Sequence, residues 1–398
     1  MRAMSLKEKS VVLGLIFLCF PWLIYGTEYT SLLITEIDHC PKLACDFTRH
    51  YLPQAQHVLQ GDGLLNSGWF YPPLLAIILT PFLVLNNPDD VWTLFNLIAC
   101  ILLVVQTSRY KKDFTTVIWS IALVSTSISV LHALKWGQVS IWISILLLSA
   151  LSSIHSMSKW RAISLGLAGA IKIYPLFFLL IPLFQRRLSQ VVKAVGVFVV
   201  LGILLPWCYL GANITLYWHA IRRGQLMVSE IASGSGGQAL TPTLNRWFVS
   251  GDFIGGVTGD APVLLSMVWL KWFILSVAML GFVRFLWRTW QLEVLTTRVG
   301  YQLLIGVHLF LQPGWVHYFS WLPCVQMWCW IKGDRFTKGL VVISVLLERL
   351  PLLRLSQDLY FQWSRTGLLT VSILILWFAL ERIGRSVSRE SQVNAISV

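Results

Sequence analysis

Charged residues are scarce in this 398-residue sequence, where they make up 12% and only 18 residues are acidic. In soluble globular proteins roughly a quarter of all residues are charged. A soluble enzyme held by a single membrane anchor is therefore excluded. The sequence also lacks a polar domain in which basic and aromatic residues alternate. A nucleic-acid partner is therefore excluded, even though the formal net charge is +13.

Several kinds of site and architecture have no matching pattern. The seven cysteines and eight histidines show no spacing typical of a zinc site. Glycine gathers in residues 233–238, but the Lys-Ser or Lys-Thr pair of a nucleotide-binding loop does not follow. We interpret that run as a flexible flap and expect neither a metal nor a cofactor. Ten-residue segments of alternating polarity are also absent, which excludes a β-barrel.

Apolar residues make up 56% of the sequence, and the mean hydropathy is +0.69. Their runs recur from end to end, and a helix needs roughly 20 such residues to cross a bilayer. We therefore predict an all-α polytopic membrane protein, one domain over residues 1–398, with about 12 transmembrane helices. The expected spans lie near residues 11–25, 71–86, 91–107, 114–133, 138–156, 162–184, 190–210, 263–286, 298–313, 315–331, 338–355 and 364–382.

Two long polar stretches, residues 27–70 and 211–261, separate these runs. Basic residues favour cytoplasmic loops, and the Arg186-Arg187 turn and the C-terminal tail fit that side. With an even number of spans, both long loops then face the extracytoplasmic side of a multi-pass plasma-membrane protein. Arg109 in a short loop falls on the other side, so the charge bias that supports this orientation is small.

Asp46 begins the most informative segment of the first long loop. Positions 46–60 suit a short helix that ends at Gly61, so Asp46 is either the cap of that helix or a catalytic carboxylate. Tyr71 follows, and the Pro72-Pro73 pair predicts the start of a spanning helix because proline is tolerated in a first helical turn.

Lys172 and His317 stand out in the spans. Lys172 lies inside an apolar run, where a charge is costly and marks function by default; the alternative is a side chain that reaches toward the interface. Pro175 is expected to break this helix and to open space for a ligand phosphate. His317 follows the Gln312-Pro313-Gly314 break, and it is either functional or a hydrogen-bonded structural histidine.

Together, these motifs resemble glycosyltransferase family 87, a GT-C family of polyprenyl-phosphate-mannose-dependent α-mannosyltransferases. The resemblance covers about residues 40–330 and implies a GT-C-type bundle. The residues that carry it are Asp46, Phe47, Tyr51, Gly61, Tyr71-Pro72-Pro73, Gly137-Gln138, Ile171 to Pro175, Trp315 and His317-Tyr318.

The resemblance implies an inverting transfer of a hexose from a lipid-linked sugar donor to a glycolipid or glycan acceptor. In such enzymes a loop carboxylate deprotonates the acceptor hydroxyl, and Asp46 is the expected base. Lys172 and Arg246, with Arg222 and Arg223 behind them, are the cations available for the leaving phosphate. His317 either orients Asp46 or holds the phosphate. The resemblance assigns three further residues to substrate binding: Tyr51, Tyr71 and Gln138.

Some alternatives stay open from the sequence. Glu36 and Asp38 form a Glu-x-Asp pair of the kind found in GT-C loops, so the base could lie in that pair instead. Cys40 and Cys45 could form a disulfide or remain free thiols. A secondary transporter or lipid flippase also carries polar residues within its bundle, and a non-catalytic assembly factor would need none of them.

Overall fold

The computed structural model describes residues 5–25, 43–61, 69, 71–152, 159–219, 237–249, 262–292, 295–311 and 314–396. Within those residues the secondary structure is helical, with a single isolated antiparallel bridge between Gly237 and Trp315. The predicted all-α class is confirmed. Among the described residues, three helical stretches, 88–108, 188–219 and 268–290, are long and apolar enough to cross a membrane, and two bent pairs raise that number to five. The protein is thus a membrane protein; about 12 spans stay a prediction.

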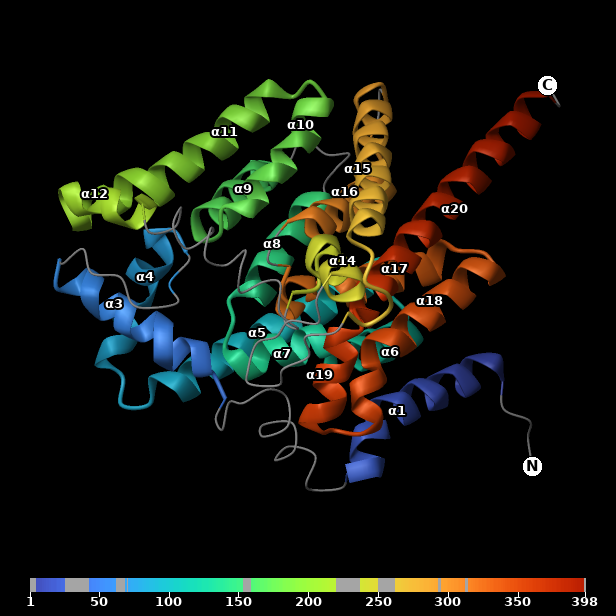
Figure 1. Cartoon of the computed structure of the whole chain (residues 1–398), viewed down its shortest axis with the longest axis horizontal. Helices are drawn as coiled ribbons and strands as arrows, with labels where there is room; N and C mark the ends of the chain where they lie inside the picture. The colour runs from blue at the N-terminus through green and yellow to red at the C-terminus, as the bar shows by residue number, and fades with distance from the viewer. Residues whose placement is uncertain are drawn as a thin grey trace.

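Figure 1 labels many of the described helices and shows their order along the chain by colour. The N-terminal half contains α1 (Leu6–Tyr25), η2 (Phe47–Tyr51), α3 (Leu52–Leu59), α4 (Pro73–Leu79), η3 (Thr80–Val84), α5 (Pro88–Ser108), α6 (Phe114–Ser125), α7 (Ile128–Trp136), α8 (Ser140–Ser152), α9 (Lys159–Ile171), η4 (Tyr174–Leu179), α10 (Leu180–Phe184) and α11 (Leu188–Val199). The remainder contains η5 (Val200–Leu204), α12 (Leu205–Leu210), η6 (Gly211–Asn213), α14 (Leu240–Phe248), α15 (Val268–Trp290), α16 (Thr297–Phe310), η7 (Val316–Phe319), α17 (Leu322–Lys332), α18 (Arg335–Arg349), η8 (Leu350–Leu353), α19 (Gln357–Arg365) and α20 (Leu368–Ile396).

Several of the predicted spans are broken among the described residues, and two of these breaks lie close to the predicted site residues. The expected span 114–133 is the pair α6 and α7, which bend by 54° at their junction. The expected span 162–184 ends as an α-helix at Ile171 and continues as a 3-10 helix from Tyr174. Pro175 causes the second break as predicted, because proline cannot continue the hydrogen-bond ladder. The first break was not predicted, because no proline or glycine marks it.

The second long loop contains the short helix α14, which the sequence analysis missed because it read residues 211–261 as one polar stretch. Leu240, Leu244 and Phe248 bury one side of α14 against residues of α15 and α16. The chain just before α14 is fixed as well, since the backbone N–H of Gln238 donates to the Gly314 carbonyl at 2.8 Å. This end of the loop therefore packs against the segment that carries His317.

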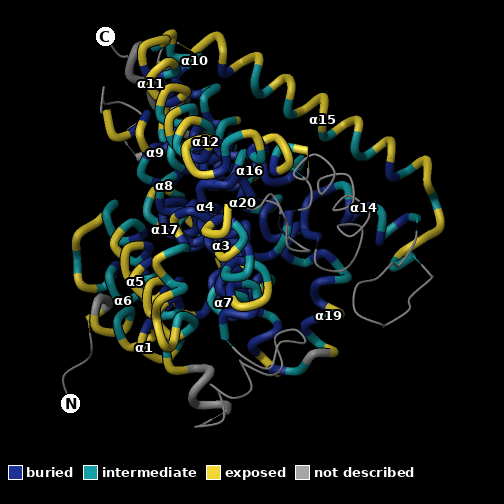
Figure 2. The backbone as a smooth tube through the Cα atoms, turned by 90° about the vertical axis from the view of Figure 1, so that its left-hand side faces the viewer, coloured by how far each residue is buried: buried dark blue, intermediate teal, exposed yellow. Residues whose placement is uncertain are grey.

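Burial separates lipid-facing helices from the core (Figure 2). The 18-residue apolar window of α15 has no buried residue, and large side chains such as Trp269, Phe273 and Leu280 are exposed along it. By contrast, α9 packs closely on α11. The two helices are so near that a Cβ at Gly166 would lie 2.5 Å from the Ala194 carbonyl oxygen. Small residues at such crossings are how helices approach one another in membranes.

Candidate active site

Asp46 lies in a helical backbone conformation, with φ −67° and ψ −32°, just before η2. Its side chain makes no capping hydrogen bond, so the capping alternative is wrong. The carboxylate instead accepts a hydrogen bond from Gln138 Nε2, across 92 residues of sequence. The side chain is 21% exposed, and its Oδ1 lies 4.0 Å from Nε2 of His50, one helical turn on. Asp46 is thus held on one side and accessible on the other.

Two tyrosines orient the Gln138 amide toward Asp46. The hydroxyls of Tyr51 and Tyr71 each lie 2.9 Å from Gln138 Oε1 and 2.7 Å from one another. Because a hydroxyl can donate to Oε1 and the NH₂ group cannot accept, this contact turns Nε2 toward the carboxylate. Burial, with a smaller effect from Asp46, raises the pKa of Tyr51 well above its usual value, so its hydroxyl keeps the proton that it donates.

A backbone contact fixes the segment before Asp46. The Ala44 amide nitrogen donates to the Lys135 carbonyl at 2.8 Å, and a Cβ at Gly137 would lie 2.7 Å from Ala44 Cα. Gly137 also ends α7 with φ +66°, a left-handed conformation that favours glycine. The position next to Gln138 must therefore be glycine for two reasons, and its contact places Asp46 beside the Gln138 amide.

Lys172 lies directly after the end of α9, buried between two tyrosine rings. Its Nζ donates to Ser140 Oγ at 3.0 Å and lies 4.2 Å and 5.0 Å from the ring centroids of Tyr318 and Tyr71. Its side chain does not reach toward the interface, since the residue is only 4% exposed. Tyr71, over whose ring the Nζ lies, contacts the Gln138 that binds Asp46. An ammonium has three donors and one hydrogen bond in the described structure, so two donors remain for an anion.

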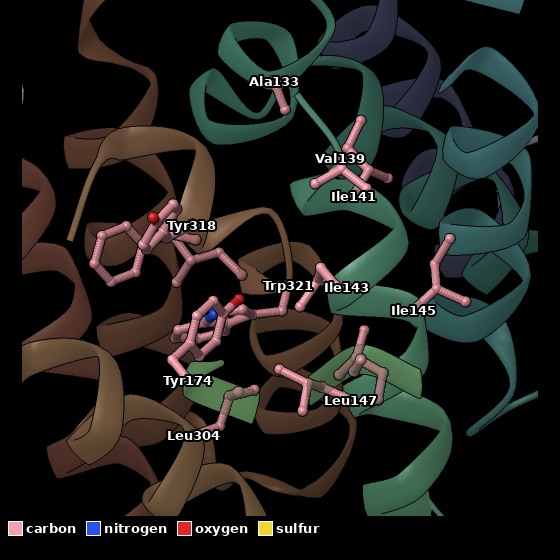
Figure 3. Packing of buried hydrophobic residues seen from close by; sticks show 14 of the residues in the cluster. Ala133, Val139, Ile141, Ile143, Ile145, Leu147, Tyr174, Leu304, Tyr318 and Trp321 are labelled. Atoms are coloured by element: carbon pink, nitrogen blue, oxygen red, sulfur yellow. The ribbon is translucent and has the colours of Figure 1, made fainter. Parts of the chain in front are cut away.

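An aromatic cluster surrounds Tyr318, one of the two tyrosines that contact Lys172. The ring of Tyr174 stacks on that of Tyr318 at 5.5 Å, and His308 lies edge-on to Tyr174 at 5.1 Å. Figure 3 shows Tyr174 and Tyr318 gathered with Trp321 in the core of the bundle. The Ile171-to-Pro175 motif thus supplies both the buried cation and part of the aromatic surroundings that hold it.

His317 is buried, and it stacks on His132 of α7 with ring centroids 5.4 Å apart. Within the described residues neither of its ring nitrogens has a hydrogen-bond partner. Its predicted contact with Asp46 is therefore not formed, while a role at the phosphate stays a prediction. The sequence analysis did not single out His132 or His50; the only signal for His50 was its position four residues after Asp46, on the same helical face.

Arg246 occupies a different environment. Its Nε donates to the Arg365 carbonyl at 3.0 Å and its Nη2 to Thr243 Oγ1 at 3.3 Å, where α14 meets the end of α19. These bonds place it at a helix junction, and its role toward substrate stays a prediction.

Other predicted residues of the two long loops cannot be placed. The following lie outside the described residues: Glu36, Asp38, Cys40, Arg222, Arg223 and most of the glycine-rich run. Cys45 is disulfide-bonded, which excludes a free thiol at that position. In the described parts of the chain no group of three or more His, Cys, Asp or Glu could hold a metal ion; the metal prediction itself stays untested.

The geometry so described has a carboxylate that is accessible on one side and a buried lysine that is linked to it through Tyr71 and Gln138. The family model of glycosyltransferase family 87 matches residues 69–313, and no curated protein matches the chain. Of the predicted site residues that the structure describes, Tyr71, Gln138, Lys172 and Arg246 fall in the matched range. Asp46 precedes the range but is hydrogen-bonded to Gln138 within it. Since the match spans more than half of the chain, the protein belongs to glycosyltransferase family 87.

Proposed function

We propose that the protein is an inverting glycosyltransferase that moves a hexose from a polyprenyl-phosphate donor to a lipid-linked or cell-envelope glycan acceptor. Mannose is the expected sugar, from the resemblance of the motifs. The reaction takes place on the extracytoplasmic side of the plasma membrane, in a GT-C-type bundle whose two long loops face that side. Family membership supports glycosyl transfer itself, whereas the donor, the sugar and the side of the membrane are part of the proposal.

The observation that carries the proposal is the pairing of Asp46 with Gln138 next to Lys172. Asp46 takes the proton of the acceptor hydroxyl, and the acceptor oxygen attacks the anomeric carbon of the donor. The bond from that carbon to the phosphate oxygen breaks, and its electron pair stays on the phosphate. A fixed cation aimed at a developing negative charge is an efficient catalytic device, and the two spare donors of Lys172 suit that task.

The experiment that tests the proposal is sugar transfer by the purified protein in proteoliposomes with labelled polyprenyl-phosphate mannose. We expect a mannosylated lipid or glycan product, and a deletion strain should lack one product that is longer by a single hexose, as seen by mass spectrometry. Uptake of solute or lipid without any sugar transfer would contradict the proposal and favour a secondary transporter or flippase.

Replacing Lys172 by alanine should lower kcat/KM for the donor about 10- to 100-fold, because a hydrogen bond to a charged group contributes about 1.5–3 kcal/mol and negative charge develops on the phosphate as the donor bond breaks. The measurement is transfer at varied donor concentration. Lys271 is a matched control, because its Nζ also lies over an aromatic ring, that of Trp272 at 4.4 Å on α15. Lys271→Ala should leave kcat/KM for the donor within about twofold. An unchanged kcat/KM in Lys172→Ala would remove the phosphate role.

A further inference from the structure

The bend between α6 and α7 leaves a backbone group that the helices cannot satisfy. The Ala122 and Val124 carbonyls accept from the amides of Thr126 and Ser127, whereas among the described residues no backbone amide donates to the carbonyl of Leu123. A backbone carbonyl without a partner is costly in a membrane protein, where water does not reach it. Arg349 supplies the partner, since its Nη2 donates to Leu123 O at 2.7 Å.

Glu348, the residue before Arg349, holds the other side of the same bend. Its Oε1 accepts from the hydroxyl of Ser127, which stands at the N-cap of α7 and makes no capping bond to its own helix. Arg349 also donates from Nε to Thr126 Oγ1 at 2.9 Å. The cation thus lies at the C-terminal end of α6 and the anion at the N-terminal end of α7, which is the favourable order for both helix dipoles.

The two charges are fully enclosed by polar partners. Glu348 and Arg349 form an ion pair and are 0% and 5% exposed. Gln326 of α17 donates to Glu348 Oε2 at 3.1 Å and to Ser344 Oγ at 3.3 Å. Ser372 of α20 lies 2.9 Å from Ser344 in turn. The bend is therefore fixed from α17, α18 and α20 together, and we call this set of contacts the elbow network.

The other end of α7 holds the candidate base. The Lys135 carbonyl binds Ala44, Gly137 contacts Ala44, and Gln138 binds Asp46. α7 is only nine residues long, so a change in its direction at the elbow moves its C-terminal end. A displacement of about 1 Å at reacting groups can lower a rate about 100-fold.

We propose that Glu348 and Arg349 are positioning residues, which set the direction of α7 and thereby place Asp46 for catalysis. The proposal rests on the function proposed above, because it treats Asp46 as the base. It assigns the buried ion pair a role in the reaction although neither residue belongs to the group around Asp46.

The test compares Glu348→Gln and Arg349→Met with the double variant Glu348→Leu/Arg349→Leu. Each single change leaves one buried charge without its partner, whereas removal of both charges of a buried pair is often neutral for stability. We expect kcat to fall about 10- to 100-fold in all three, with the donor KM within about twofold. Hydrogen exchange at the Ala44 amide should become faster in all three, because its bond to Lys135 opens.

The double variant separates positioning from stability. If it recovers the melting temperature of the unmodified protein yet keeps a low kcat and fast exchange at Ala44, the ion pair acts through α7. If activity and exchange recover together with stability, the pair only stabilises the fold and the proposal is overturned. Leu380→Ala in α20, a fully buried residue, is a destabilised control and should leave exchange at Ala44 unchanged.

The exchange measurement also distinguishes the two proposals from one another. Hydrogen exchange needs no substrate, so it reports the coupling between elbow and Ala44 even when no transfer is detected. Absence of transfer in the unmodified protein would overturn the proposed function. Unchanged exchange at Ala44 in all three elbow variants would overturn the positioning role while the proposed function stands.

Discussion

Asp46→Asn should lower the rate of sugar transfer about 100- to 10,000-fold, the range that general-base catalysis contributes. Asparagine has nearly the shape of aspartate, and its side-chain oxygen can still accept from Gln138 Nε2. The substitution therefore removes the proton acceptor while the contacts that position the side chain remain. The measurement is the initial rate of transfer in proteoliposomes at saturating donor, together with donor binding, which should change little.

Asp113→Asn is the matched control for this substitution. Asp113 caps α6 by accepting from the Thr116 amide at 2.7 Å, and asparagine caps helices equally well. Its neighbour Lys111 and the Thr116 amide lower the pKa of Asp113 to about 2, so it is a charged carboxylate at neutral pH. Asp113→Asn should keep the unmodified rate. A normal rate in Asp46→Asn would remove Asp46 as the base and bring Glu36 and Asp38 back into consideration.

Gly137→Ala is expected to have the second-largest effect, a loss of about 100-fold in kcat with unfolding easier by about 1–2 kcal/mol. The stability loss comes from the left-handed backbone at φ +66°. The loss of activity comes from the new Cβ, which would lie 2.7 Å and 2.9 Å from Cα and Cβ of Ala44 and would displace the segment that leads to Asp46. Transfer kinetics and thermal unfolding in detergent measure the two effects.

Two further variants separate backbone strain from the clash. Gly61 also has a left-handed backbone, at φ +69°, but no atom of the described residues lies within 4 Å of its Cβ position. Gly61→Ala should therefore lose similar stability and keep its activity. Asparagine tolerates the left-handed backbone better than alanine but still carries a Cβ. Gly137→Asn should therefore show the same loss of kcat as Gly137→Ala, with a smaller loss of stability. If Gly61→Ala and Gly137→Ala lost activity equally, strain and not the contact with Ala44 would explain the defect.

Three to five stretches among the described residues are long and apolar enough to cross a membrane, so about 12 spans stay a prediction. Hydropathy alone was nevertheless enough to predict an all-helical membrane protein, because a spanning helix needs roughly 20 apolar residues. It gave no warning of the bend after Ser125 or of α14. The bend depends on Glu348 and Arg349, which lie more than 200 residues away in sequence. α14 depends on packing against α15 and α16, and its own composition resembles a loop.

For the site as well, the sequence predicted individual residues but not the contacts between distant segments. The predicted Asp46, Tyr51, Tyr71 and Gln138 lie in one hydrogen-bonded group, although the sequence did not show that Gln138 would bind Asp46 itself. The role of Gly137 depends on its contact with Ala44 and could not be read from either segment. Glu348 and Arg349 were missed although their charge inside the expected span 338–355 was a signal of the kind that drew attention to Lys172.

The elbow network also has a consequence for the order of events during biosynthesis. The Ser127 hydroxyl and the Glu348 carboxylate are 221 residues apart in sequence, so α6 and α7 leave the ribosome long before the residues that lock their junction. Until α18 is synthesised, the nascent chain already contains Asp46, Gln138 and Lys172 but lacks Glu348 and Arg349, whose contacts hold the bend before α7. If these contacts position Asp46 as proposed, the enzyme gains its full activity only after α18 has been inserted.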